Sequence, residues 1–199
     1  MKNYSFDQFA AVRSFQPTVA YSPDNSRIAY VDNTSGQMNL WLMPAGGGEP
    51  TQLTHFTEHA VREVAWSPDG TRIAFYADHD SDERHQIYII SAAGGEPVKL
   101  TSAEKAQHTF MGNPWSPDGK TLAYATNDRD PATVEVVLHD VESGETRRPI
   151  KPRHRYYPAG WSPDGQHLTL WARMPGMDEN ILLMHISRSE ERRVGKECR

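Results

Sequence analysis

The sequence predicts an all-β protein made of about four consecutive sheets, and three observations lead to this prediction. One ten-residue phrase occurs four times, as YSPDNSRIAY, WSPDGTRIAF, WSPDGKTLAY and WSPDGQHLTL, starting at Tyr21, Trp66, Trp115 and Trp161. The prolines of these phrases are 45, 49 and 46 residues apart. Apart from a short candidate at 7–14, no segment has the apolar period of a helix. A period of this length is typical of repeated four-stranded sheets.

Each phrase begins with an aromatic residue and a tight turn. Proline presets φ at the second turn position, aspartate can accept a hydrogen bond from its own backbone, and glycine adopts a left-handed conformation at little cost. Asn25 replaces the glycine in the first copy, and asparagine tolerates that conformation better than most residues. The sequence therefore predicts the same corner four times.

A strand is expected after each turn, followed by a polar loop, a second strand, a glycine-rich turn and a short closing strand. The segments 27–31 and 72–76 place alanine between branched and aromatic residues, which suits a strand packed on both faces. The small alanines would let a neighbouring sheet approach closely. The second strands are expected at 38–42, 86–90, 134–138 and 180–184.

This pattern gives a four-stranded meander about every 46 residues. One such sheet cannot cover both of its faces, so neighbouring sheets must stack against it, and the architecture with this period is the β-propeller. We predict a leader at 1–14 and a partial propeller at 15–187. Its blades are expected at about 15–54, 60–101, 108–150 and 156–186, the last one incomplete and ending after its third strand.

An incomplete ring leaves the outer faces of its first and last blades uncovered. We therefore expect the isolated chain to be marginally folded or to aggregate.

The C-terminal segment 188–199, RSEERRVGKECR, differs in origin from the repeats. It is the in-frame translation of a common short-read sequencing adapter, and we interpret it as a non-native tail to be left out of fold reasoning. The lone cysteine, Cys198, lies in this tail. Disulfides and thiol catalysis are therefore not expected in the propeller.

Composition bears on the class of partner. The formal net charge of −5 argues against nucleic acid, because phosphate binding needs a basic surface. No apolar run approaches the roughly 18 residues of a membrane span, and the polar N-terminal stretch does not have the pattern of a secretory signal. We expect a cytoplasmic protein without a nucleic-acid or membrane partner.

The four phrases, the GGEP turns and the closing Leu-Thr pairs resemble the PD40-type propeller repeat, a WD40-like group, over 15–186. The resemblance implies the N-terminal propeller of a prolyl oligopeptidase (S9) serine peptidase, or alternatively a non-enzymatic TolB-like or sensor propeller that binds protein. In S9 enzymes an α/β-hydrolase domain with a Gly-x-Ser-x-Gly elbow follows the propeller. That motif does not occur in this sequence. The resemblance thus implies that the peptide substrate binds to a hydrolase domain that is missing from this chain, and that the propeller restricts access to the active site of that domain.

We assign no catalytic, cofactor-binding or metal-ligating residue, and no cofactor, to this chain. Asp78, Asp80 and Asp82 alternate like the first ligands of a calcium loop, but the glycine required at the sixth position is Glu83. A solvated hairpin tip is the simpler interpretation. Glu63 and Glu83 could anchor a substrate amine, as acidic residues do in some S9 propellers, but nothing local distinguishes them.

Two further groups have simple structural interpretations. A basic run between blades three and four could meet a carboxylate, although a solvated connector is the simpler interpretation; it comprises Arg147, Arg148, Lys151, Arg153, His154 and Arg155. The tryptophans are expected to pack blade against blade; they are Trp41, Trp66, Trp115, Trp161 and Trp171.

Overall fold

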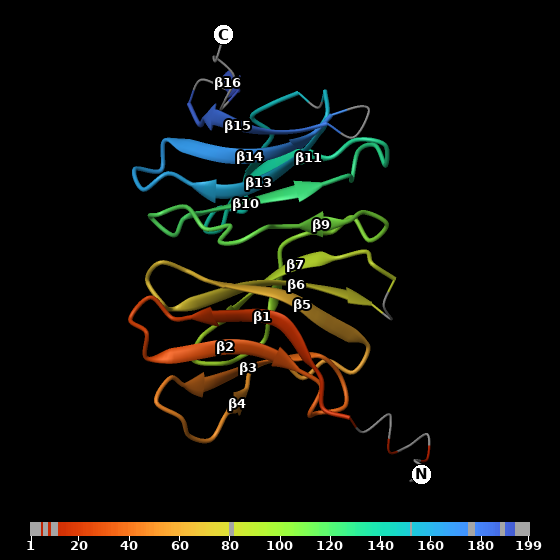
Figure 1. Cartoon of the computed structure of the whole chain (residues 1–199), viewed down its shortest axis with the longest axis vertical. Helices are drawn as coiled ribbons and strands as arrows, with labels where there is room; N and C mark the ends of the chain where they lie inside the picture. Colours follow the sequence, from red (N-terminus) through yellow and green to blue (C-terminus); the bar gives the residue numbers. More distant parts are fainter. Residues whose placement is uncertain are drawn as a thin grey trace.

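The computed structural model consists of four antiparallel four-stranded sheets, which follow one another in chain order along the long axis of the molecule (Figure 1). It describes residues 5, 8, 12–79, 82–151, 153–174, 178–187 and 190–193. Of the expected helical stretch at 7–14, residues 7 and 9–11 lie outside these residues, and residues 12–14 are not helical. The all-β class and the four repeated sheets are confirmed. Within the described ranges, no helix is long and apolar enough to cross a membrane.

Each sheet is a simple meander, because consecutive strands pair along the chain. Blade 1 contains β1 (Phe15–Tyr21), β2 (Arg27–Asp32), β3 (Asn39–Pro44) and β4 (Thr51–Gln52). Blade 2 contains β5 (His59–Trp66), β6 (Arg72–His79), β7 (Gln86–Ser91) and β8 (Val98–Lys99).

Blades 3 and 4 repeat the order with local differences. Blade 3 contains β9 (His108–Thr109), β10 (Thr121–Thr126), β11 (Glu135–Asp140) and β12 (Thr146–Arg147). Its first strand is short because the segment 112–114 contains Gly112 at φ 60° and a proline, which cannot donate a ladder hydrogen bond. Blade 4 contains β13 (Arg155–Trp161), β14 (His167–Arg173), β15 (Glu179–His185) and β16 (Glu190–Arg193).

The fourth sheet differs from the sequence expectation at its outer edge. Only three strands were expected there, but β16 pairs antiparallel with β15, with His185 opposite Glu190 and Leu182 opposite Arg193. Backbone groups along an edge strand can pair with any extended segment that reaches them. The pairing therefore needs no apolar pattern in the segment, and none is present in its sequence, EERR.

The core lies between the blades. One cluster joins blades 1 and 2, a second joins blades 2 and 3, and a third joins blades 3 and 4. The alanines that follow the first three corners are completely or almost completely buried; they are Ala29, Ala74 and Ala123. This agrees with the expectation that a small side chain in the second strand lets the neighbouring sheet approach.

The outer face of blade 1 is open. Val19 is 63% exposed, whereas Val64, its counterpart in blade 2, is 4% exposed. Tyr21 is 57% exposed, whereas Trp66 is 3% exposed. These positions are equivalent in the two sheets. The difference between their exposed fractions therefore shows how much of each side chain a neighbouring blade covers.

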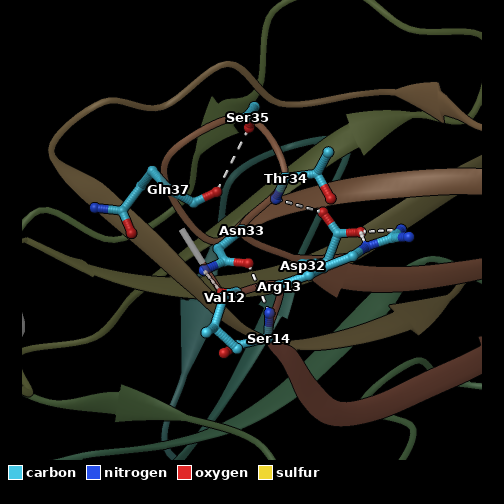
Figure 2. A network of polar contacts seen from close by, with 8 residues as sticks. All are labelled: Val12, Arg13, Ser14, Asp32, Asn33, Thr34, Ser35 and Gln37. Atoms are coloured by element: carbon cyan, nitrogen blue, oxygen red, sulfur yellow. Dashed lines mark hydrogen bonds and ion pairs between the residues drawn. The ribbon is translucent and has the colours of Figure 1, made fainter. Parts of the chain in front are cut away.

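The last residues before blade 1 are fastened to its β2–β3 loop (Figure 2). Arg13 donates to the buried carboxylate of Asp32 at 2.7 and 3.2 Å. Asn33 accepts from the backbone N–H of Ser14 at 2.7 Å and donates to the carbonyl of Val12 at 3.1 Å. These contacts fix the direction in which the chain enters β1.

Candidate functional site

The repeated Ser-Pro-Asp-Gly corner is a closed hydrogen-bonded unit. In blade 2 the Ser67 hydroxyl donates to Asp69 at 2.5 Å and accepts from the backbone N–H of Arg72 at 2.9 Å. Gly70 closes the turn by donating its N–H to the Ser67 carbonyl at 2.9 Å and has φ 68°. The serine hydroxyl is therefore engaged on both sides and is not placed as a nucleophile.

The same arrangement lowers the pKa of every corner aspartate. Hydrogen bonds from Ser22 and Ser26 lower the pKa of Asp24 to about 2. The serine hydroxyls of the other three corners lower the pKa of their aspartates from the ordinary value; these are Asp69, Asp118 and Asp164. A hydrogen bond to the charged form favours that form. The corner carboxylates are thus set up as anions that organise the turn.

Successive corners stack on one another. A Cβ added to Gly70 would lie 3.5 Å from Pro23 Cδ, and one added to Gly119 would lie 3.6 Å from Pro68 Cδ. Gly165 has the same relation to the proline of the third corner. Each glycine thus supplies a positive φ, and its position lies directly beside the proline of the preceding blade.

The tryptophans that open the corners bridge neighbouring blades, as expected. The indole N–H of Trp66 donates to the carbonyl of Ala20 at 3.0 Å, and that of Trp115 to Ala65 at 3.2 Å. Trp161 donates to the blade 3 residue Pro114 at 2.9 Å. The other two tryptophans differ: Trp171 contacts Tyr157 within blade 4, and Trp41 is half-buried in β3.

A pocket of about 560 Å³ lies where the first strands of blades 1 and 2 adjoin. Its lining combines apolar Val19, Tyr21 and Trp66 with the carboxylate of Glu63. The Thr18 hydroxyl donates to Glu63 at 2.5 Å and so orients the carboxylate. We call this the first-strand pocket. Its chemistry suits an extended chain with apolar side chains and a hydrogen-bond donor.

Glu63 and Glu83 are not brought together. Glu83 lies in the β6–β7 loop, at φ 59°, whereas Glu63 lies in β5 beside the first-strand pocket. A second pocket, of about 460 Å³, lies near that loop. It is lined by side chains of both charges, including His59, Arg84 and Glu104.

The aspartates weighed as calcium ligands have other partners. Asp78 accepts two hydrogen bonds from Arg62, at 2.9 and 3.0 Å, and Asp82 accepts from the backbone N–H of Arg84 at 2.9 Å. Asp80 lies outside the described residues. Among the residues that the structure describes, no group of three His, Cys, Asp or Glu is arranged to bind a metal ion.

The basic run divides into structural and exposed members. Arg148 donates to Asp128 at 2.7 Å and lies 3.4 Å from Glu135, which is almost completely buried. Arg147 donates to the backbone carbonyl of Ile186 at 3.1 Å. Lys151, Arg153 and Arg155 are exposed and His154 is half-buried. The run therefore joins blades 3 and 4 at its start and faces solvent at its end.

Two functions of repeated residues had not been predicted. The threonines of the closing Leu-Thr pairs cap the third strands, because Thr54 accepts from Leu40 N at 2.8 Å and donates to Asn39 at 2.9 Å. Thr101 makes the same pair of bonds in blade 2. The recurrence of Leu-Thr at the repeat period was the available signal.

The second function belongs to the arginine that follows the corner. Arg27 crosses to blade 2, where it donates to the carbonyls of Gly70 and Ala92, both at 3.1 Å. Arg72 crosses to blade 3 and donates to Gly119 at 2.9 Å. The arginines can be seen in the sequence, but the carbonyls that accept their hydrogen bonds belong to the next repeat, so the pattern of one repeat does not predict these contacts.

Comparisons with known proteins agree with this fold. The family model described as the prolyl oligopeptidase N-terminal β-propeller domain matches residues 53–181. The uncharacterized peptidase YuxL of Bacillus subtilis (strain 168) is 27% identical over 199 residues, covering 80% of this chain and 30% of that protein. The TolB homologue of Chlorobium luteolum is 27% identical over 147 residues, covering 72% of this chain and 30% of that protein.

A solved prolyl endopeptidase structure matches with a TM-score of 0.70 at 15% identity, over 95% of this chain and 30% of that one. The chain thus spans about a third of the length of these relatives. The family match covers more than half of the chain and extends over blades 2 to 4. The chain belongs to the family of prolyl oligopeptidase N-terminal β-propeller domains.

Proposed function

We propose that this chain is the substrate-gating propeller portion of an S9-type serine peptidase that acts on peptides. The observation that carries the proposal is the family match over residues 53–181. A peptidase with 27% identity to this chain is about three times as long as the matched part, which leaves room for a catalytic domain. The reaction would thus take place outside this chain.

The chain's own chemistry supports a role in access rather than in bond cleavage. Its recurrent serines and aspartates are engaged in the corners. The first-strand pocket offers apolar side chains beside the carboxylate of Glu63, a surface that an extended peptide could follow. A propeller over an active site would exclude folded proteins and bulk water while admitting short peptides.

The experiment that tests this proposal starts with the gene. The coding sequence beyond Ser187 should be determined from unamplified DNA. We expect an α/β-hydrolase domain with a Gly-x-Ser-x-Gly elbow, followed by Asp and His. The full-length protein should then react with a fluorophosphonate probe and hydrolyse a peptide ester, whereas the 199-residue chain should do neither. A stop codon shortly after the last blade would overturn the proposal.

A second candidate is a non-enzymatic propeller that binds protein. The TolB homologue of Chlorobium luteolum, with the same 27% identity, favours it. On this alternative the full gene encodes no nucleophile elbow, and the purified full-length protein stays unlabelled by the fluorophosphonate. The two candidates thus give opposite results in one labelling experiment.

A further inference from the structure

The three junctions between successive corners are built alike, except at one side chain. The residue whose backbone N–H binds the corner serine is Arg27 in blade 1 and Arg72 in blade 2. In blade 3 the same position is Thr121, whose N–H donates to Ser116 at 2.9 Å. Threonine is too short to reach the next blade.

The two arginines show what that position does when it is filled. The Arg27 guanidinium lies 4.9 Å from the centroid of the Trp66 ring, and the Arg72 guanidinium lies 5.0 Å from that of Trp115. Each also donates to the corner glycine carbonyl of the next blade, at 3.1 and 2.9 Å. A planar cation is therefore held between an indole face and a backbone acceptor.

At the third junction a pocket of about 300 Å³ lies where the arginine would be. We call it the corner pocket. It is lined by Thr121, Trp161 and Gly165 and by the carboxylates of Asp118 and Asp164. Trp161 is equivalent to Trp66 and Trp115, because it pairs with Leu168 as they pair with Ile73 and Leu122. The indole and the glycine of the two filled junctions are thus present here too.

One further cation borders the corner pocket. Arg147 donates to the Ile186 carbonyl at 3.1 Å, as Arg27 does to the equivalent carbonyl of Ala92. Across the described part of the chain, no donor is found at the Gly165 carbonyl and no cation lies over the Trp161 ring. Asp118 and Asp164 line the pocket together with Arg147. Two carboxylates and one guanidinium therefore border it, and this balance of formal charge favours one more cation.

We propose that the corner pocket binds the guanidinium group of an arginine side chain carried by a peptide. The guanidinium would lie on the Trp161 indole and donate to the Gly165 carbonyl, which reproduces the contacts of Arg72 in the neighbouring junction. A lysine ammonium fits less well, because it is a compact, strongly hydrated charge that does not stack as a plane. The site is separate from the first-strand pocket and does not depend on the proposed peptidase activity.

The test uses N-acetyl-L-argininamide, whose only charge is the guanidinium. The full-length protein, labelled with ¹⁵N at tryptophan, is titrated while the indole N–H signals are recorded by NMR, with Trp161→Phe to assign the signal of Trp161. We expect saturable movement of that signal. N-acetyl-L-citrullinamide, the neutral isostere, should bind about tenfold more weakly. Equal binding of the two probes, or no movement of the Trp161 signal, would overturn the proposal.

Two variants test the site from opposite directions. Thr121→Arg should fill the pocket from within, raise the melting temperature and weaken probe binding by about tenfold or more. Arg72→Thr should open the second junction, lower the melting temperature and create a second probe site at Trp115. Thr121→Ser is the control and should bind like the wild type. The proposal fails if Thr121→Arg binds the probe as wild type does, or if Arg72→Thr gains no site.

Discussion

Replacing one corner serine by alanine tests whether the corner is structural, and blade 2 gives the sharpest case. Ser67 is completely buried, and its hydroxyl accepts from the backbone N–H of Arg72 at 2.9 Å. In Ser67→Ala that N–H loses its partner in a place that water does not reach. A buried donor left unpaired costs about 1–3 kcal/mol. The lost bond to Asp69 adds little, because the carboxylate is exposed and water replaces the hydroxyl.

We therefore expect Ser67→Ala to lower the free energy of unfolding by about 2 kcal/mol, a factor of about 30 in the folded-to-unfolded ratio. Ser162→Ala is the matched control, since Ser162 makes the same bonds but is only half-buried. Its cost should be about half as large, because water can reach the freed N–H. Urea unfolding followed by tryptophan fluorescence measures both, and amide exchange at Arg72 reports the local effect. Equal costs at the two serines, or a change below about 0.5 kcal/mol for Ser67→Ala, would refute the reasoning.

Two further predictions concern a corner glycine and a buried histidine. Gly119→Ala should cost about 1–2 kcal/mol in thermal melts, because Gly119 has φ 70°, whereas Gly46→Ala, at an unrestricted position, should change stability by less than about 0.5 kcal/mol. Burial lowers the pKa of His108 from 6.5 to about 4, so the unfolded chain binds a proton more readily. The contribution of neutral His108 to the free energy of unfolding should be fully present above pH 6.5 and should fall by about 3 kcal/mol between pH 6.5 and 4. In His108→Phe the free energy of unfolding should depend less steeply on pH over this range. An unchanged dependence on pH would contradict this account.

The corners and the sheets could be predicted because the information is local and repeated. Pro, Asp and Gly determine the turn within four residues, and the apolar alternation after Ser67 and Ser116 indicates a strand in any context. Asn25 was also predictable, since its φ of 57° is one that asparagine accepts. Because the pattern occurs four times, an error in one predicted strand would not have changed the repeat period or the architecture inferred from it.

The contacts between blades could not be predicted in the same way. Arg27 and Thr121 occupy equivalent positions in the sequence, but their difference matters only when the facing indole and carbonyl of the next blade are in place. The first-strand pocket likewise depends on how β1 and β5 adjoin, since Glu63 carries no local signal of its own. β16 was missed because edge pairing uses backbone groups, which every sequence has.

Each corner after the first places its glycine beside the proline of the preceding corner, and in this respect the first blade differs from the other three. Asn25 is exposed and lies in the first corner of this chain, whereas a Cβ added to Gly70 would lie at contact distance from Pro23 of the preceding corner. If blade 1 were moved to an interior position, the Cβ of Asn25 would make ordinary van der Waals contact with the proline of the preceding corner, and its amide group would have to turn away from that proline. A circular permutation or blade duplication that moves this corner inward would therefore test whether Asn25→Gly improves the packing of one corner on the next.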